Sequence, residues 1–205
     1  MSTSNPLTTY TGLPPFAAIR PEHVEPAIDA MIALNRQRIA ERLAAGAPWT
    51  YDNLVAVLDE YEDRLDRAFD PASHLNAVVN SEPLRQAYNA CLPKLSDFAT
   101  EIGQNRALFD AYAAVKAAEY DRLDTAQRKV IDNALRDFHL SGIDLPPAQQ
   151  KRFAEIQSRL AELTSQYSDN VLDATNAWSK HVADAAQLRG LPDSALAQAR
   201  QAAQQ

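Results

Sequence analysis

Apolar side chains recur every three or four residues along most of the chain, the spacing that gathers them on one face of an α-helix. The pattern is most regular over residues 84–102 and 153–178. The first stripe consists of Leu84, Tyr88, Cys91, Leu95, Phe98 and Ile102. The second consists of Phe153, Ile156, Leu160, Leu163, Tyr167, Val171, Ala174 and Trp178. This periodicity predicts an all-α, elongated multi-helix domain built from antiparallel helical hairpins.

Capping residues and helix breakers divide the pattern into separate helices. We expect a first helix over residues 22–45, ended by Gly46, because a glycine tolerates the left-handed conformation that closes many helices. Pro71 should break or kink the second helix and Pro93 should kink the third, since an interior proline removes a backbone hydrogen bond. The expected N-caps of the later helices are Thr50, Ser81, Asn105 and Asp124.

The two ends of the chain depart from the helical pattern. Residues 1–21 are rich in proline and predict an extended arm, which Leu13, Phe16 and Ile19 should hold against the helices of residues 22–177. Apolar and polar side chains alternate over residues 178–183, which is compatible with one short strand. A single strand leaves its backbone groups unpaired, so we expect it to be an open edge or to pair with a second copy of the chain.

Composition limits the class of protein. The chain has 205 residues, with 20 basic and 27 acidic side chains, a net charge of −7 and a pI near 5.1, which argues against nucleic-acid and anionic membrane partners. The single cysteine excludes an internal disulfide and fits a reducing compartment. The N-terminus lacks a signal-peptide pattern, and no apolar run approaches the roughly 20 residues that span a bilayer. We therefore expect a cytoplasmic protein.

The four histidines are too dispersed to form a recognisable metal motif. Successive histidines are 51, 65 and 42 residues apart, so no two share a helical turn and the zinc-binding His-Glu-x-x-His arrangement is absent. They are His23, His74, His139 and His181. His74 lies beside Ser73 and Asn76, and we expect it to make a structural hydrogen bond there.

Two other features could carry chemistry, and both have a structural interpretation. Cys91 lies on an apolar stripe, so we expect a buried thiol with a high pKa rather than a catalytic thiolate. An acidic face of the second helix interleaves with Arg64 and Arg67, and we expect it to be solvated rather than a pair of catalytic acids or a cation site. Its members are Asp59, Glu60, Glu62, Asp63, Asp66 and Asp70. The sequence identifies no catalytic, metal-ligating or substrate-binding residue.

Four stretches, taken in order, carry a resemblance to a known family. They are LPPF with IRPEHVEPA within residues 13–27, SHLNAV at 73–78, DNALRDF with LSG within 132–142, and YSDNVLDAT at 167–175. Together they resemble the N-terminal region of the thimet oligopeptidase/neurolysin family of zinc metallopeptidases. The resemblance covers essentially the whole chain.

The resemblance implies a cytoplasmic, largely helical enzyme that cleaves short peptides inside a deep channel. In this family, zinc is held by two histidines of a His-Glu-x-x-His helix and a downstream glutamate, and none of these can be placed on a position of this chain. The resemblance therefore implies that zinc belongs to the parent enzyme only, that this region forms part of the channel wall and is inactive alone, and that residues 178–205 are a truncated linker. Its partners would be short peptides and its own C-terminal catalytic domain.

A self-standing helical scaffold is the alternative. Such a module would bind a partner peptide or helix in a groove between its long helices. A reading frame that continues past Gln205 into a His-Glu-x-x-His segment would favour the peptidase, and a stop codon there would favour the scaffold.

Overall fold

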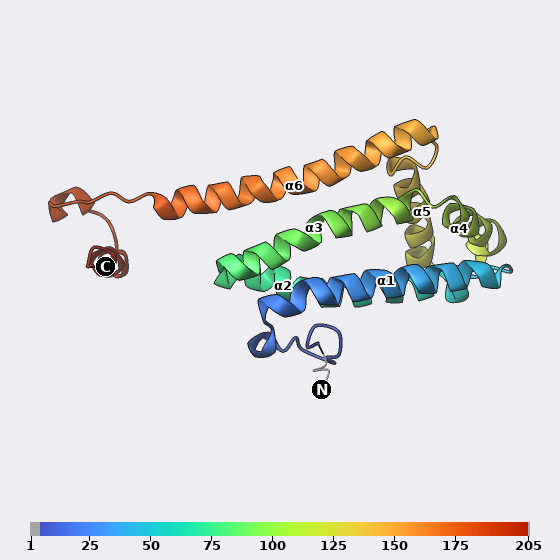
Figure 1. Ribbon diagram of the computed structural model, residues 1–205, viewed down its shortest axis with the longest axis horizontal. Coiled ribbons are helices and arrows are strands. Elements are labelled where there is room, and N and C mark those ends of the chain that lie inside the picture. The colour runs from blue at the N-terminus through green and yellow to red at the C-terminus, as the bar shows by residue number, and fades with distance from the viewer. Residues whose placement is uncertain (1–4, 205) are drawn as a thin grey trace. The chain divides into compact units, whose positions relative to one another are not determined.

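The computed structural model describes residues 5–204 and confirms an all-α chain (Figure 1). Its helices are α1 (Pro21–Ala45), α2 (Ala56–Val79), α3 (Glu82–Gly103), α4 (Arg106–Glu119), α5 (Thr125–Leu140), α6 (Pro147–Ala177) and α7 (Asp193–Ala202). The chain divides into two compact units, Met1–Ser165 and Gln166–Gln205, and each is described by itself. No helix within the described residues is long and apolar enough to cross a membrane.

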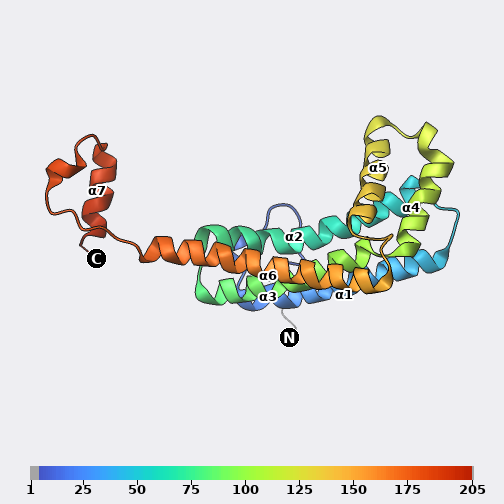
Figure 2. The ribbon, with the colours of Figure 1, turned by 90° about the horizontal axis from the view of Figure 1, so that it is seen from above.

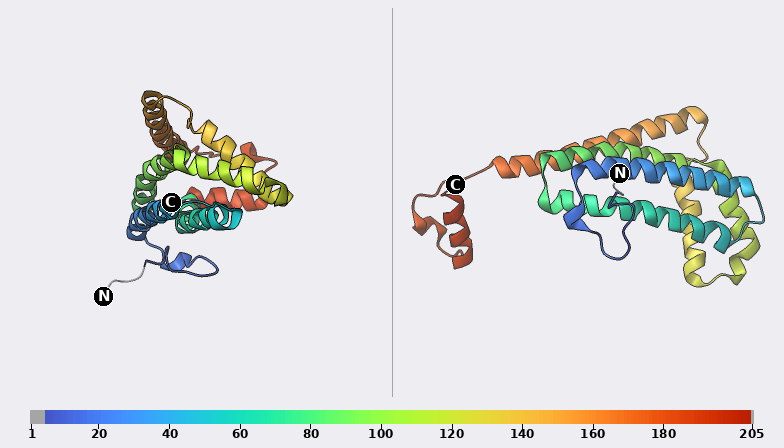
Figure 3. Two further views of the ribbon diagram at one scale, coloured as in Figure 1. Left: turned by 90° about the vertical axis from the view of Figure 1, so that its right-hand side faces the viewer. Right: turned by 60° about the horizontal axis from the view of Figure 1, so that its bottom comes forward.

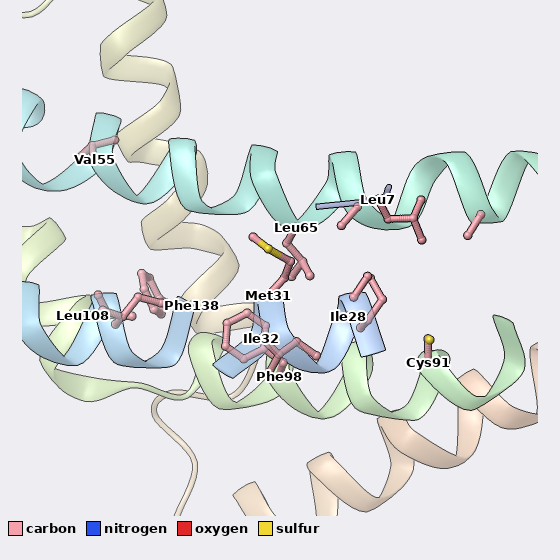
Figure 4. Packing of buried hydrophobic residues seen from close by; sticks show 14 of the residues in the cluster. Leu7, Ile28, Met31, Ile32, Val55, Leu65, Cys91, Phe98, Leu108 and Phe138 are labelled. Atoms are coloured by element: carbon pink, nitrogen blue, oxygen red, sulfur yellow. The ribbon is translucent and has the colours of Figure 1, made fainter. Parts of the chain in front are cut away.

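Helices α1, α2 and α3 form the body of the first unit, with α2 antiparallel to the other two. Figure 4 shows side chains from the three helices turned toward the space between them, including Met31 and Ile32 of α1, Leu65 of α2 and Phe98 of α3. All four are buried in one continuous apolar core. Burial of this kind is the main source of stability for amphipathic helices, so the core fixes how α1, α2 and α3 pack.

The α4–α5 hairpin lies at the end of this body where α1 finishes and α2 begins (Figure 2). Leu108 of α4 and Ile131 of α5 are almost completely buried and extend the core into the hairpin. The ring of Phe138 meets the ring of Tyr112 edge-on at 5.7 Å between centroids. The hairpin is thereby fixed against the body of the unit.

Three of the four predicted N-caps make their capping hydrogen bonds. The Thr50 hydroxyl accepts from the Asn53 N–H at 3.0 Å and starts a short π-helical turn, Tyr51–Val55, that leads into α2. Asn105 and Asp124 accept from backbone N–H groups at the starts of α4 and α5, at 3.1 and 2.8 Å. Ser81 occupies the N-cap position of α3, but its side chain makes no capping bond. The predicted helix stop at Gly46 is confirmed, with φ of 75°.

The predicted break at Pro71 is wrong, because α2 continues through it to Val79. Proline has no N–H, so the carbonyl of Arg67, four residues earlier, loses its usual helical donor. The hydroxyl of Tyr10 donates to that carbonyl at 2.8 Å, and the Arg67 guanidinium lies over the Tyr10 ring. Pro71 itself is buried in the unit. Helix α3 also continues through Pro93, and the kinks expected at Pro71 and Pro93 stay predictions.

The N-terminal arm packs against the first unit, although not through all the residues that we expected. Figure 3 shows the arm beside the α1 and α2 pair. Leu7 and Ile19 are buried, and Phe16 belongs to a short 3₁₀ turn, Phe16–Ala18, and lies against the His74 ring. Leu13 is 90% exposed, so its predicted packing is wrong. The arm is held mainly by Leu7, Ile19 and the Tyr10 hydroxyl.

In the second unit, the short strand expected at residues 178–183 does not form. These residues are irregular and lead into a 3₁₀ turn, Ala185–Leu188, before α7. Apolar and polar residues do alternate over residues 178–183, but a strand requires a neighbouring strand that pairs with its backbone groups. None of the residues described between 166 and 204 offers one.

Gly103 allows a close approach between α3 and the end of α5. A Cβ atom added at Gly103 would lie 2.5 Å from both Cβ and Oγ of Ser141. Replacing a helical glycine by alanine usually gains up to about 1 kcal/mol. We expect Gly103→Ala instead to lower the free energy of unfolding by about 1–3 kcal/mol, because the added methyl overpacks the contact. Urea titration followed by circular dichroism measures this.

The double variant Gly103→Ala/Ser141→Gly provides the control for this prediction. Removing the Cβ of Ser141 takes away the atoms that the new methyl group would strike, so part of the lost stability should return. A single variant as stable as the parent would contradict the close approach.

Candidate functional site

A hollow of about 490 Å³ opens between α1, α2, α3, α4 and α5 of the first unit. Most of its wall is apolar, contributed by Ile39, Leu58, Leu65, Phe69, Leu95, Phe98, Ile102, Leu108 and Phe138. Concave apolar surfaces with a few polar groups are the usual form of a ligand site. The hollow is therefore the candidate functional site of this chain.

Carboxylates of α2 line one side of the hollow. Asp59, Glu62 and Asp66 follow one another at intervals of three and four residues and contribute to the same wall as Leu58 and Leu65. All three side chains remain exposed, as predicted for the acidic face, while they also border the hollow. The helix places them at the boundary between its apolar and polar faces, and the approach of α4 and α5 turns that boundary into a wall.

Glu60 and Asp63, two further acidic residues of α2, differ in whether they form an ion pair with an arginine. Glu60 forms an ion pair with Arg64, one helical turn away. Asp63 and Arg67, at the same spacing, form no ion pair within residues 5–204, and Arg67 instead covers the Tyr10 ring. Surface pairs of this kind contribute little to stability, so neither outcome changes the fold.

The three lining carboxylates all have a pKa above the ordinary value. Partial burial beside the apolar wall is the main cause for each, since it disfavours the charged form. Repulsion from Asp66 and Asp59 further raises the pKa of Glu62. Asp59, Glu62 and Asp66 make no ion pair or hydrogen bond within the described part of the chain. The hollow thus carries negative charge that no basic side chain neutralises.

Two buried polar side chains in the wall each have an oxygen that forms no hydrogen bond within the described residues. Tyr112 is only 8% exposed, and its hydroxyl makes no hydrogen bond within residues 5–204. Burial and then the charges of Asp59 and Glu62 raise the pKa of this phenol well above its usual value. Asn35 is 2% exposed; its Nδ2 donates to the Tyr61 carbonyl at 2.9 Å, but its Oδ1 has no donor. Unpaired buried polar atoms are costly and rare, which singles out the Asn35 Oδ1, whereas the Tyr112 hydroxyl is not among the fully buried unpaired atoms of the described residues.

Sequence reasoning missed both residues. A signal for Asn35 was present, since it occupies a position of the apolar stripe of α1 between Ile32 and Ile39. A polar residue at such a position predicts a buried hydrogen-bonding group. Tyr112 gave no signal, because a tyrosine on an apolar stripe is an ordinary core residue.

The structure does not bring the four histidines together. The Nδ1 of His23 accepts from the Arg20 N–H at 3.0 Å, His74 packs on Phe16, and His139 pairs with Asp144. The hydrogen bond expected of His74 is not formed within the described residues, and His181 is exposed in the second unit. No group of three or more His, Cys, Asp or Glu side chains among residues 5–204 is arranged to hold a metal ion.

Cys91 is buried, as predicted. Its side chain has no exposed surface, and the thiol donates to the Ala87 carbonyl at 3.2 Å. Burial raises the pKa of the Cys91 thiol to about 11, against a smaller opposing effect of Lys94. The ammonium group of Lys94 is held by Glu25 and Asp29 at 2.7 and 2.6 Å. A thiol in this state is a packing residue of α3.

The fold and the hollow define the class of the protein as an all-α, multi-helix domain. Residues 30–152 match the N-terminal domain of neurolysin/thimet oligopeptidase. The chain is 50% identical over 198 residues to oligopeptidase A of Salmonella typhimurium, covering 96% of this chain and 29% of the relative. For oligopeptidase A of Haemophilus influenzae the identity is 49% over 205 residues, covering 100% and 30%.

A plant relative is more distant. The chain is 31% identical over 201 residues to a probable cytosolic oligopeptidase A of Arabidopsis thaliana, covering 98% of this chain and 28% of the relative. The chain therefore belongs to the neurolysin/thimet oligopeptidase family, in the region of its N-terminal domain, which confirms the resemblance that the four sequence stretches carried. It spans about 30% of the length of the curated relatives that it matches.

Proposed function

We propose that this chain is the non-catalytic, helical N-terminal part of a longer cytoplasmic zinc metallopeptidase that hydrolyses short peptides. Residues 22–177 form part of the wall of its substrate channel, and residues 178–205 lead toward the catalytic part. The observation that carries the proposal is the match to oligopeptidase A over all of this chain and only 30% of the relative. The role of this region is steric, because a helical wall admits flexible peptides and excludes folded proteins.

Helix α6 supports the proposal through its exposed apolar stripe. Within the first unit, the stripe residues Ile156, Leu160 and Leu163 are each at least 44% exposed, although they repeat with helical spacing. No residue of the helix is buried, and the Ser165 hydroxyl donates to Asn89 of α3 at 2.7 Å. Isolated helices gain most of their stability from packing an apolar face. We propose that the remainder of the longer polypeptide covers this stripe.

The proposal places the zinc ion outside this region. The family's name implies a metallopeptidase, but the side chains described here do not fit a zinc site, since no three potential ligands converge. No step of peptide hydrolysis is therefore assigned to a residue of this chain. What the region contributes is shape and charge at the channel wall.

A peptidase assay tests the proposal. The 205-residue chain and the polypeptide encoded by the complete reading frame are each incubated with an internally quenched fluorescent peptide, with and without added zinc. We expect turnover only from the longer polypeptide, because the zinc ligands lie there. Zinc-dependent cleavage by the 205-residue chain would overturn the proposal.

A self-standing scaffold that binds a peptide or helix is the second candidate. The observation that favours it is the first unit itself, whose α1–α5 helices share a continuous buried core and enclose a hollow. In that case the reading frame would stop after Gln205 and no longer polypeptide would show peptidase activity. The same assay therefore separates the two candidates.

A further inference from the structure

We propose that the hollow between α1, α2, α3, α4 and α5 binds a primary alkylammonium group, with the charged head beside Asp59, Glu62 and Asp66 and the carbon stem along the apolar wall. The proposal concerns the chemistry of this hollow alone and does not depend on the peptidase function. The hollow lies entirely within the first unit.

The polar groups that lack partners in the wall call for a ligand rich in donors. Asp59, Glu62 and Asp66 are acceptors without a donor among residues 5–204. The Tyr112 hydroxyl can accept as well as donate, and it lies in the negative potential of Asp59 and Glu62. An ammonium group has three donors, no acceptor and a positive charge, which matches this set. An anion or a neutral acceptor would leave the carboxylates uncompensated.

The remaining wall favours an organic cation over an inorganic one. Phe138 and Tyr112 bring aromatic rings to the hollow, and aromatic rings attract cations. Leu58, Leu65 and the other apolar side chains give a methylene chain a surface to cover. A bare metal ion would need several converging oxygen ligands, which the described residues do not offer. A straight alkyl chain with a terminal ammonium would contact the apolar side chains with its stem and the carboxylates with its charged head.

Two sources share this chemistry. A free aliphatic amine and the side chain of a lysine in a peptide both carry an ammonium on a straight carbon stem. The hollow is lined by α2 at the acidic side and by α3, α4 and α5 opposite, so a peptide backbone attached to the stem would have to remain at the opening. The experiment therefore includes one probe of each kind.

Nitrogen–proton correlation NMR of the 205-residue chain, titrated with n-pentylammonium chloride at constant ionic strength, tests the proposal. We expect saturable shifts of amide signals from α2 residues 59–66 and from Tyr112. The neutral analogue n-pentanol should bind about tenfold more weakly, because charge-assisted hydrogen bonds are the stronger ones. Shifts that do not saturate, or equal binding of pentanol, would overturn the proposal.

The second arm uses N-acetyl-lysine amide, which carries the same head and stem on a blocked peptide unit. Binding as tight as that of pentylammonium supports the proposal with peptide lysines as the source. Binding at least about tenfold weaker than that of pentylammonium supports it with free amines as the source. Neither probe binding would overturn it.

Matched variants assign the effect to the hollow. Tyr112→Phe keeps the ring and removes a hydroxyl that holds no partner, so the fold should be unchanged while pentylammonium binds several-fold more weakly. Glu62→Gln should weaken binding about tenfold, since it removes a lining charge.

The control variant is Asp63→Asn. It removes one charge from the same helix at a position outside the wall, and binding should change by less than about twofold because Asp63 does not line the hollow and solvent screens an exposed charge. If Asp63→Asn and Glu62→Gln weakened pentylammonium binding equally, the ligand would be attracted to the net charge of α2 rather than to the hollow. That result would overturn the proposed site.

Discussion

Ile131→Ala should lower the free energy of unfolding by about 3 kcal/mol, whereas Ile156→Ala should lower it by less than about 0.5 kcal/mol. The two residues are chemically identical and both belong to apolar stripes of helices. Ile131 of α5 is completely buried, so its replacement removes packed methyl groups and leaves a cavity. Ile156 of α6 is 44% exposed, and the loss of its methyl groups is largely made up by solvent. Urea unfolding followed by circular dichroism measures both values.

Ile131→Val supplies the graded control. It removes a single methylene and should cost about 1 kcal/mol, between the parent and Ile131→Ala. Equal costs at Ile131 and Ile156 would mean that α6 packs as deeply as α5 in solution. That result would also remove the support that the exposed stripe gives to the proposed covering polypeptide.

The contrast between these two isoleucines shows where sequence periodicity stops being informative. The stripes of α3 and α6 look equivalent in the sequence, and both segments are helices. Leu84, Cys91 and Phe98 of α3 are buried, while no residue of α6 is. Periodicity reports which face of a helix is apolar, and the burial of that face depends on which other elements reach it.

The continuation of α2 through Pro71 could not be predicted from local sequence, because it also depends on a contact with a distant part of the chain. Local rules correctly state that an interior proline leaves a carbonyl without its helical donor. The donor that replaces it, the Tyr10 hydroxyl, lies 57 residues before Arg67 in the chain. The helix ends marked by Thr50, Asn105 and Asp124 were predictable because each cap and its N–H partner lie three residues apart.

At the candidate site, too, features set by local sequence could be predicted, and features set by tertiary packing could not. The acidic face of α2 was visible in the sequence, and so was the burial of Cys91. The position of Asp59, Glu62 and Asp66 beside an apolar hollow was not, since it depends on how α4 and α5 pack near α2. Tyr112 becomes a functional candidate only because its hydroxyl lies unpaired near those carboxylates. The face stays solvated, and non-local packing adds an apolar hollow beside it.

Cys91 should react with an aromatic disulfide reagent at pH 8 at least about 100-fold more slowly in the native chain than in the chain unfolded in urea. The thiolate is the reactive species, and burial raises the pKa of Cys91 from 9.0 to about 11. A higher thiol pKa leaves less thiolate at a given pH, and a shift of this size lowers its fraction about 100-fold. Absorbance of the released thiolate measures the rate.

The double variant Cys91→Ala/Ser194→Cys is the matched control, because Ser194 is exposed at the start of α7. Its thiol should react at nearly the same rate with and without urea. Native Cys91 has no exposed surface, so the reagent must also wait for α3 to open locally, which lowers the rate further. If native Cys91 instead reacted as fast as the unfolded chain, the thiol would be accessible and ionisable. A nucleophilic role for Cys91 would then replace the packing role that its hydrogen bond to Ala87 supports.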